Sequence, residues 1–339
     1  MNPSVVRETD ANRLVGLVNA FYGSASVCAA AELGIFAELA HLRKMDADSL
    51  AHALKLDPAC ARVFLDGCVA LGLLEKDGLL YRNSIEAETY LVPGSPLDLS
   101  WLIREAREVY GSWAHLADFV RTGTAVAPPN GLAESDPTRL KSHLLSLHKH
   151  ILYTGRPIVR RLDLHGRRKL LDLGGGPGTY SVLISLEYPQ LLCTVLDRPE
   201  VLKIAAALIE QQGASQTVST VAGDFLREPL PGGNDAVCLF GLLHRLDAPQ
   251  IPRLIERVAD SLNPGGVVYV MDPMTDETRT MPRSSALFAL NMALTRREGD
   301  VFSDVELQNW IEEAGLRDFA VEVLPQPQAQ WLARARKPG

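Results

Sequence analysis

A cluster of glycines between a short apolar run and a helical pattern is the segment best suited to hold a ligand. The apolar run covers residues 170–173. It is followed by Gly174, Gly176 and Gly178, which alternate with other residues. A dinucleotide-binding turn instead has the spacing G-x-G-x-x-G and receives a pyrophosphate at the start of a helix. The tighter spacing here indicates a ligand without a pyrophosphate, whose amino-acid end lies against the glycine backbone.

Acidic residues stand where such a ligand would present its ammonium group and its hydroxyl groups. Asp172 comes just before the glycines, where its charge favours an ammonium group and disfavours a phosphate. Asp197 follows the next predicted strand, 23 residues after Gly174, and could accept hydrogen bonds from both hydroxyls of a ribose. Asp224 and Phe225 follow the third predicted strand and could hold an adenine amino group and stack on its ring. Together these features predict a binding site for S-adenosyl-L-methionine.

The elements that must position these residues are strands and helices in alternation. Helical patterns separate the first five predicted strands, which is typical of a doubly wound, mostly parallel sheet in an α/β protein. The predicted strands cover residues 169–173, 191–196, 217–222, 235–240, 267–271, 319–324 and 330–335. We therefore expect a seven-stranded sheet in a domain that spans residues 166–339.

The first 95 residues are predicted to form a separate, mostly helical domain with one hairpin. Asp57 and Pro58 are typical of a helix start, and Asp77 with Gly78 is typical of a hairpin turn. The order of helix, helix and hairpin indicates a winged-helix unit. Its candidate recognition helix, residues 57–72, has a single basic residue, so we expect a dimer-forming surface there and no DNA binding. Residues 96–165 are predicted to be a helical linker that helps to form an acceptor pocket.

Composition excludes several classes of protein. The chain has 339 residues, with 34 Lys and Arg against 41 Asp and Glu, and a net charge of −7 disfavours nucleic acid as a partner. No apolar run is expected to approach the roughly 18 residues of a membrane span, and the polar N-terminus is not that of a signal peptide. The five cysteines are interpreted as reduced core thiols: Cys28, Cys60, Cys68, Cys193 and Cys238. These features predict a cytoplasmic protein that contacts no membrane.

The chain resembles the class I S-adenosylmethionine-dependent methyltransferases. Over nearly all of its length it is similar to the plant caffeic-acid-type and bacterial natural-product O-methyltransferases. The resemblance is carried by the glycine turn, by the acids after the second and third strands, and by the segment Phe240–Asp247, which contains His244. It implies a Rossmann-like catalytic domain, an N-terminal winged-helix dimerisation domain and a homodimer. It also implies S-adenosyl-L-methionine as cofactor, S-adenosyl-L-homocysteine as product, and no metal ion.

The same resemblance assigns catalytic roles to two residues. His244 stands at the position of the family's general base, which removes the proton of an acceptor hydroxyl. Asp272 stands where a supporting acid, usually Glu, orients that base. Arg245 departs from the family's acid or small polar residue, and its cation favours the neutral imidazole. Val301 stands where the plant enzymes carry a second acid, with Glu298 and Asp300 nearby.

Candidate acceptor contacts come from the helix that precedes the catalytic domain and from scattered apolar residues. In the family this helix lines the cofactor or acceptor pocket, which brings in His148, His150 and Tyr153. The two histidines are two positions apart and point to different helix faces, so no metal site is expected. An apolar wall could be formed by Trp113, Phe288 and Met292, although core packing explains each of these alone equally well.

We therefore expect a homodimeric enzyme that methylates a hydroxyl of a small, largely apolar, aromatic natural-product intermediate. The departures at Arg245 and Val301 keep a carbon or nitrogen acceptor open. A family member that uses the cofactor structurally, as a decarboxylase or a hydroxylase, is a further alternative. A winged-helix regulator that senses a small molecule is the alternative from a different class, and the acidic recognition helix counts against it.

Overall fold

The computed structural model describes residues 11–95, 97–126, 136–296, 299–325 and 330–339. The chain divides into two compact units, residues 1–107 and residues 108–339. Helices of the predicted linker region, residues 96–165, fall in both units.

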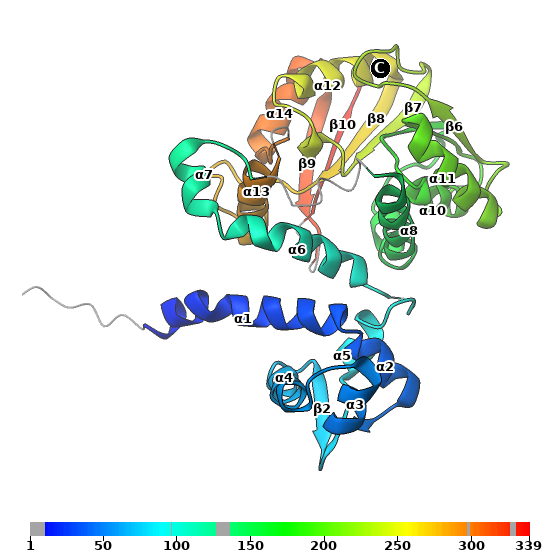
Figure 1. Ribbon diagram of the computed structural model, residues 1–339. Helices are drawn as coiled ribbons and strands as arrows, with labels where there is room; N and C mark the ends of the chain where they lie inside the picture. The colour runs from blue at the N-terminus through cyan, green and yellow to red at the C-terminus, as the bar shows by residue number, and fades with distance from the viewer. Residues whose placement is uncertain (1–10, 96, 127–135, 297–298, 326–329) are drawn as a thin grey trace, which may run out of the picture. The chain divides into compact units, whose positions relative to one another are not determined.

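The first unit contains helices packed around a small antiparallel sheet (Figure 1). Its elements are α1 (Asn12–Glu32), α2 (Ile35–Leu42), β1 (Met45–Asp46), α3 (Ala47–Leu54), α4 (Pro58–Ala70), β2 (Leu74–Asp77), β3 (Leu80–Asn83), α5 (Ile85–Tyr90) and the first part of α6 (Ser100–Trp113). The Asp57 side chain caps α4 by accepting from the Cys60 N–H, with Pro58 at the first helical position. Gly78 turns between β2 and β3 with φ of 60°. The predicted order of helix, helix and hairpin is therefore confirmed.

Helix α1 leaves its apolar residues exposed. Leu14 is 57% exposed, Val18 72% and Phe21 52%. The helix is long and apolar enough to cross a membrane by length and composition, and 6% of that stretch is buried. The expectation that no apolar stretch reaches this length is therefore wrong. Single glycines and polar residues interrupt the run, but its mean hydropathy stays as high as that of a membrane-spanning helix.

The cysteine prediction is wrong at one position. Cys68, Cys193 and Cys238 are buried and Cys28 is half-buried, whereas Cys60 is exposed. Cys60 lies in the first turn of α4, where its backbone N–H reaches the Asp57 cap, so the helix start sets its position and the core does not.

The second unit is built on a seven-stranded sheet with the order β6-β5-β4-β7-β8-β10-β9. The strands are β4 (Lys169–Leu173), β5 (Leu192–Asp197), β6 (Val218–Ala222), β7 (Asn234–Phe240), β8 (Leu262–Asp272), β9 (Arg317–Val323) and β10 (Trp331–Arg336). The first five in chain order are parallel to one another, and β10 is antiparallel to both β8 and β9. The predicted fold class is confirmed.

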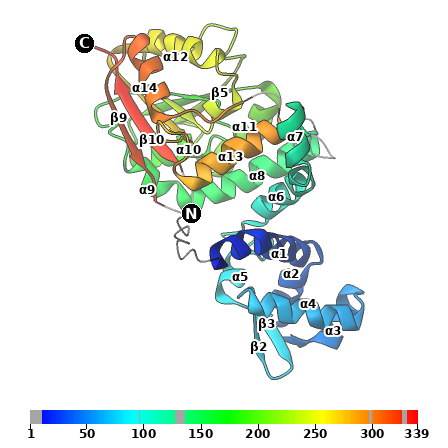
Figure 2. The same cartoon turned by 90° about the vertical axis from the view of Figure 1, so that its left-hand side faces the viewer.

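Helices cover both faces of this sheet, as Figures 1 and 2 show. Helices α10 (Thr179–Glu187) and α11 (Pro199–Gln211) pack on one face, and α12 (Gln250–Ser261) and α14 (Asp304–Glu313) pack on the other. The second unit also contains α7 (Leu116–Thr122), α8 (Pro137–Thr154), α9 (Arg156–Val159) and α13 (Arg283–Thr295). Alternate residues of β4 enter different cores: Leu170 packs with α10 and α11, and Leu171 packs with α12 and α14. The strand order reverses between β4 and β7, which is where open α/β sheets bind ligands at the carboxyl ends of their strands.

Helix α13 is an element that the sequence pattern did not predict. Its buried residues include the polar Ser285 and Thr295, while Leu287 is 45% exposed. Its apolar residues therefore form no single stripe, and the preceding Pro282 provides no side-chain cap. This helix therefore could not be predicted from its own periodicity, and it is seen only in the folded unit.

Candidate functional site

The glycine turn after β4 has a backbone that requires glycine. Gly174, Gly176 and Gly178 have φ values of 65°, 55° and 71°. A Cβ on Gly174 would lie 2.7 Å from a methyl carbon of Leu242, so this glycine packs tightly against the loop after β7. A Cβ on Gly176 would meet only Leu144, at 3.8 Å. The turn therefore presents open backbone at Gly176, as a closely approaching ligand requires.

Asp172 lies beneath this turn. It is 1% exposed, and its Oδ2 accepts a hydrogen bond of 2.7 Å from the Ser181 hydroxyl. A Cβ on Gly175 would lie 2.6 Å from the same carboxyl group. Burial raises the pKa of Asp172 to about 6, against a lowering by the Ser181 hydrogen bond and with a further raise from the charge of Asp197. This buried negative charge supports the turn from below.

Asp197 lies at the end of β5, beside the open part of the turn. Its Oδ2 accepts from the Gly176 N–H at 2.9 Å and its Oδ1 from the Arg198 N–H at 2.7 Å. Burial raises the pKa of Asp197, while these backbone hydrogen bonds and the charges of Arg198 and Arg245 lower it. The carboxylate is thus fixed next to Gly176.

Asp224 and Phe225 lie on the turn after β6. The Asp224 Oδ1 accepts from the Leu226 N–H at 2.9 Å, and its Oδ2 lies 3.7 Å from the Arg227 Nε. Phe225 is half-buried against the core on the α12 side, and its carbonyl accepts a hydrogen bond of 2.6 Å from Arg257. Both residues follow the carboxyl end of β6, which lies on the same side of the sheet as the carboxyl end of β4 and its glycine turn.

His244 and Asp272 form a hydrogen-bonded pair at the ends of two neighbouring strands. His244 lies in the short 3₁₀ helix η2 (Leu243–Arg245) after β7, and its Nδ1 is 2.5 Å from the Oδ1 of Asp272 at the end of β8. The Oδ2 of Asp272, which is fully buried, accepts from the Leu243 N–H at 2.9 Å. Asp272 therefore fixes both the ring and its backbone. Because Nδ1 donates to the carboxylate, Nε2 carries the lone pair.

The side chain of His244 is 13% exposed and is packed from the α13 side. Its ring meets the Phe288 ring edge-on, with centroids 5.7 Å apart. A Cβ on Gly299, whose φ is 93°, would lie 2.5 Å from the His244 carbonyl oxygen and 2.8 Å from the Met292 Cε. Gly299 thus packs closely against the backbone of His244, and the Phe288 ring packs against its imidazole.

Residues 298–301, which correspond to the segment with a second acid in the plant enzymes, place no described carboxylate against His244. Val301 is fully buried in apolar surroundings. Asp300 accepts from the Val301 N–H and lies 3.8 Å from Arg279, so its carboxylate belongs to a surface ion pair. Glu298 lies outside the described residues. Of these acids, the structure describes Asp272 alone in contact with His244.

The candidate acceptor contacts separate into two groups. Phe288 and Met292 share one face of α13 beside His244, and Trp113 is tied to this helix by a 2.9 Å hydrogen bond from its Nε1 to Asn291. On α8, His148 is 5% exposed and its Nδ1 lies 2.8 Å from the Thr179 hydroxyl at the start of α10. His148 therefore meets the glycine turn.

The other two residues of α8 lie differently. His150 is half-buried, and burial lowers the pKa of His150 as it does that of His148. Tyr153 is 50% exposed. The sequence analysis missed the partners Thr179 and Ser181, although buried hydroxyls in the first turn of an apolar helix are a signal that could have indicated them.

Comparisons with known proteins identify the family of this chain. Residues 113–317 match the model of the O-methyltransferase domain family, and residues 15–93 match that of the O-methyltransferase dimerisation domain. The chain belongs to the O-methyltransferase family. It is an S-adenosylmethionine-dependent methyltransferase, as the resemblance predicted, and it carries the family's dimerisation domain.

Relatives of this methyltransferase act on several kinds of acceptor. It is 31% identical over 328 residues to the 3-hydroxy-5-methyl-1-naphthoate 3-O-methyltransferase of Streptomyces sahachiroi, covering 96% of this chain and 94% of the relative. It is 32% identical to the N,N-dimethyltransferase OxyT of Streptomyces rimosus, covering 97% of each chain. The structure of human N-acetylserotonin methyltransferase in complex with S-adenosylmethionine matches with a TM-score of 0.84, 29% identity and full coverage of both chains.

Proposed function

We propose that this enzyme methylates a hydroxyl group of a small, largely apolar, aromatic natural-product intermediate. We further propose that it works in the cytoplasm as a homodimer, without a metal ion. The observation that carries the proposal is the His244–Asp272 pair, because it provides an oriented base beside an aromatic wall. The naphthoate O-methyltransferase and the tetracenomycin 8-O-methyltransferase among its relatives support an aromatic polyketide as the acceptor class.

The residues at the sheet edge fit the cofactor. The open backbone at Gly176, the buried charge of Asp172 and the fixed carboxylate of Asp197 suit the amino-acid and ribose parts. Asp224 and Phe225 suit the adenine. Bound there, S-adenosylmethionine supplies an electrophilic methyl group.

The chemistry assigned to the protein's own groups is a proton transfer. His244 Nε2 accepts the proton of the acceptor hydroxyl, which leaves the oxygen able to form its new bond to carbon. Asp272 accepts from Nδ1 throughout and stabilises the imidazolium that results. Phe288 and Met292 exclude water and orient the aromatic ring of the acceptor, with Trp113 holding α13 in place.

Replacement of His244 tests this proposal. We expect His244→Ala to lower kcat by about 10²–10⁴, because the general base is lost, while the affinity for S-adenosylhomocysteine is unchanged. Turnover is measured as the mass gain of one methyl group on a panel of hydroxynaphthoates. His115→Ala, which removes an exposed histidine just before α7, is the matched control and should retain full activity. A loss below about tenfold for His244→Ala would reject the base.

A nitrogen or carbon acceptor is the second candidate. It is supported by the N,N-dimethyltransferase relative and by Val301 at the place of a second acid. The position of the new methyl group in the product, determined by NMR, distinguishes the two: a methyl on oxygen supports the first proposal, and a methyl on nitrogen or carbon supports the second.

A further inference from the structure

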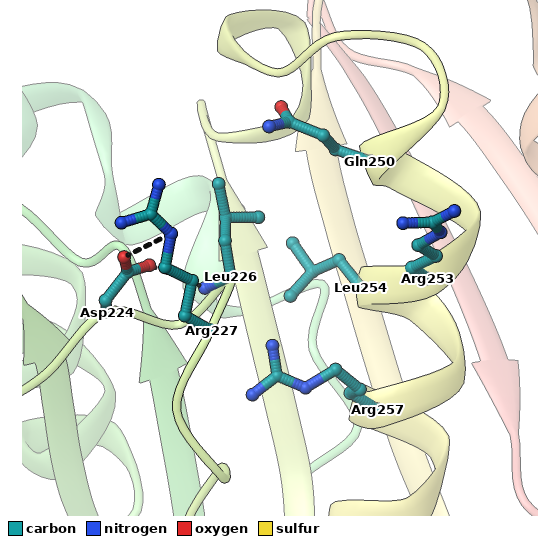
Figure 3. A pocket seen from close by; sticks show the side chains of 7 residues that line it. All are labelled: Asp224, Leu226, Arg227, Gln250, Arg253, Leu254 and Arg257. Carbon is teal, nitrogen blue, oxygen red and sulfur yellow. Dashed lines mark hydrogen bonds and ion pairs between the residues drawn. The ribbon is translucent and has the colours of Figure 1, made fainter.

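A pocket of about 360 Å³ lies between the turn after β6 and helix α12. It is lined by Asp224, Leu226, Arg227, Gln250, Arg253, Leu254 and Arg257 (Figure 3). The four residues from α12 follow one another at i, i+3, i+4 and i+7, so they form one face of the helix. The volume is within the range of small-molecule sites in proteins.

The charge around this pocket is positive. Three arginines face one carboxylate, in a chain whose net charge is −7. Arg253 and Arg257 are four positions apart on α12, where like charges repel each other. Arginine keeps its charge at every accessible pH, so this repulsion is permanent unless an anion offsets it.

These arginines keep hydrogen-bonding capacity for a ligand. Arg253 is exposed and has no hydrogen bond or ion pair within the part of the chain that the structure describes. One guanidinium nitrogen of Arg257 donates to the Phe225 carbonyl, and the other nitrogens remain available to a ligand. Arg227 lies 3.7 Å from Asp224 and is 87% exposed.

The middle of the pocket is apolar. Figure 3 shows Leu226 from the turn and Leu254 from α12 facing each other between the arginines. Leu254 is 1% exposed and belongs to the core, so it supports the floor from below, and the half-buried Leu226 provides the apolar surface that a ligand can cover. A free inorganic anion would leave the floor uncovered, whereas an anion with an apolar body would cover it.

We propose that this pocket binds an amphipathic organic anion, of the size and chemistry of an aromatic carboxylate. The carboxylate pairs with Arg253 and with the remaining nitrogens of Arg257, and the apolar body lies on Leu226 and Leu254. The pocket differs from the acceptor site, because none of its lining residues belongs to η2, α13 or the end of β8. It borders the proposed cofactor site, with which it shares Asp224.

Calorimetric titration of the full-length protein with 1-naphthoate tests the site, with neutral 1-naphthalenemethanol as the comparison ligand. We expect naphthoate to bind and Arg253→Gln to weaken that binding about tenfold or more, because a charge-assisted hydrogen bond is lost. Arg253→Lys keeps the charge and should retain most of the affinity. Arg160→Gln, which removes an exposed arginine elsewhere, should have no effect.

Three outcomes would overturn the proposal. They are the absence of naphthoate binding, an equal affinity for the neutral alcohol, and an unchanged affinity in Arg253→Gln. The last outcome would locate the anion elsewhere, for example at the acceptor site. Because Arg253 holds no structural hydrogen bond among the described residues, the variant should fold normally, and its unfolding temperature is measured to establish this.

Discussion

At the scale of single residues, the candidate site depends on two buried carboxylates that have opposite surroundings. Asp272 is matched by two donors, the His244 ring and the Leu243 N–H. Asp172 has one hydroxyl partner and the charge of Asp197 nearby, so burial raises the pKa of Asp172 to about 6. Asp272 thus has a hydrogen-bond donor for each of its two oxygens, whereas Asp172 has one donor and lies near a second negative charge.

Asp272→Asn should lower kcat by about 10²–10⁴ without weakening the binding of S-adenosylhomocysteine. An amide in this place cannot accept from both donors, because one of its two ends is itself a donor. The imidazole then loses the hydrogen bond that keeps the lone pair on Nε2. Steady-state kinetics and calorimetry measure the two quantities, and a parallel loss of cofactor affinity would contradict the role assigned to Asp272.

Asp172→Asn should stabilise the cofactor-free protein at pH 7.5, by on the order of 2 kcal/mol. The folded pKa of Asp172 is raised from 3.8 to about 6. The stability that this carboxyl contributes is therefore fully present below pH 3.8 and is lost as the pH rises through about 6. The amide avoids that loss and can still accept from Ser181.

Urea unfolding at pH 7.5 and at pH 5 measures this effect. The advantage of Asp172→Asn over the wild type should shrink at pH 5, where the wild-type carboxyl is largely protonated in the folded state. The same variant should bind S-adenosylhomocysteine more weakly, because the charge that suits its ammonium group is gone. An advantage that does not depend on pH would contradict the assignment.

At the scale of elements, α10 is anchored from two sides at the turn that precedes it. Thr179 bonds to His148 of α8, and Ser181 bonds to Asp172 of β4. Both hydroxyls are fully buried, so each bond is made away from water. Through this arrangement α8 contributes to the shape of the glycine turn, although it is distant from the turn in sequence.

A double-mutant cycle on His148 and Thr179 tests this anchor. We expect His148→Ala and Thr179→Val each to reduce stability by about 1–3 kcal/mol, and the double variant to lose less than the sum. His148→Asn places an amide near the position of Nδ1 and should restore part of the stability that His148→Ala loses. His148→Gln, whose amide lies nearer to the position of Nε2, is the matched control and should not. Additive losses would show that the two side chains do not interact.

At the scale of the whole molecule, α1 is a long helix whose apolar residues face solvent. Monomeric proteins rarely leave large apolar patches exposed, and α1 lies within the segment that matches the dimerisation domain. Burial of Leu14, Val18 and Phe21 against a second copy would remove that surface from water. This supports the proposed homodimer.

The double variant Val18→Glu and Phe21→Glu should therefore sediment as a monomer, because two like charges at the interface would have to be buried without partners. The wild type is expected to sediment as a dimer. Val120→Glu, at an apolar position that is 71% exposed on α7, is the matched control and should leave the dimer intact. A wild-type monomer, or a dimer that survives the double variant, would contradict this role of α1.

The sequence by itself determined the features that depend on local chemistry. The glycine spacing, the acids at the strand ends and the alternation of strands and helices follow from backbone conformation and from periodic burial. They predicted the sheet, the turn at Gly174–Gly178 and the membership of the family, which the fold and the comparisons confirmed. The proposed roles of the site residues remain predictions.

Only the tertiary structure decided which side chains meet. It tied His148 to Thr179, placed Asp172 beneath Gly175, and gave Asp272 two donors from the neighbouring strand end. It also showed α13, and the arginine-lined pocket between the turn after β6 and α12. The physical reason is that these contacts join segments far apart in the chain, and such pairings depend on the packing of the whole sheet and not on local periodicity.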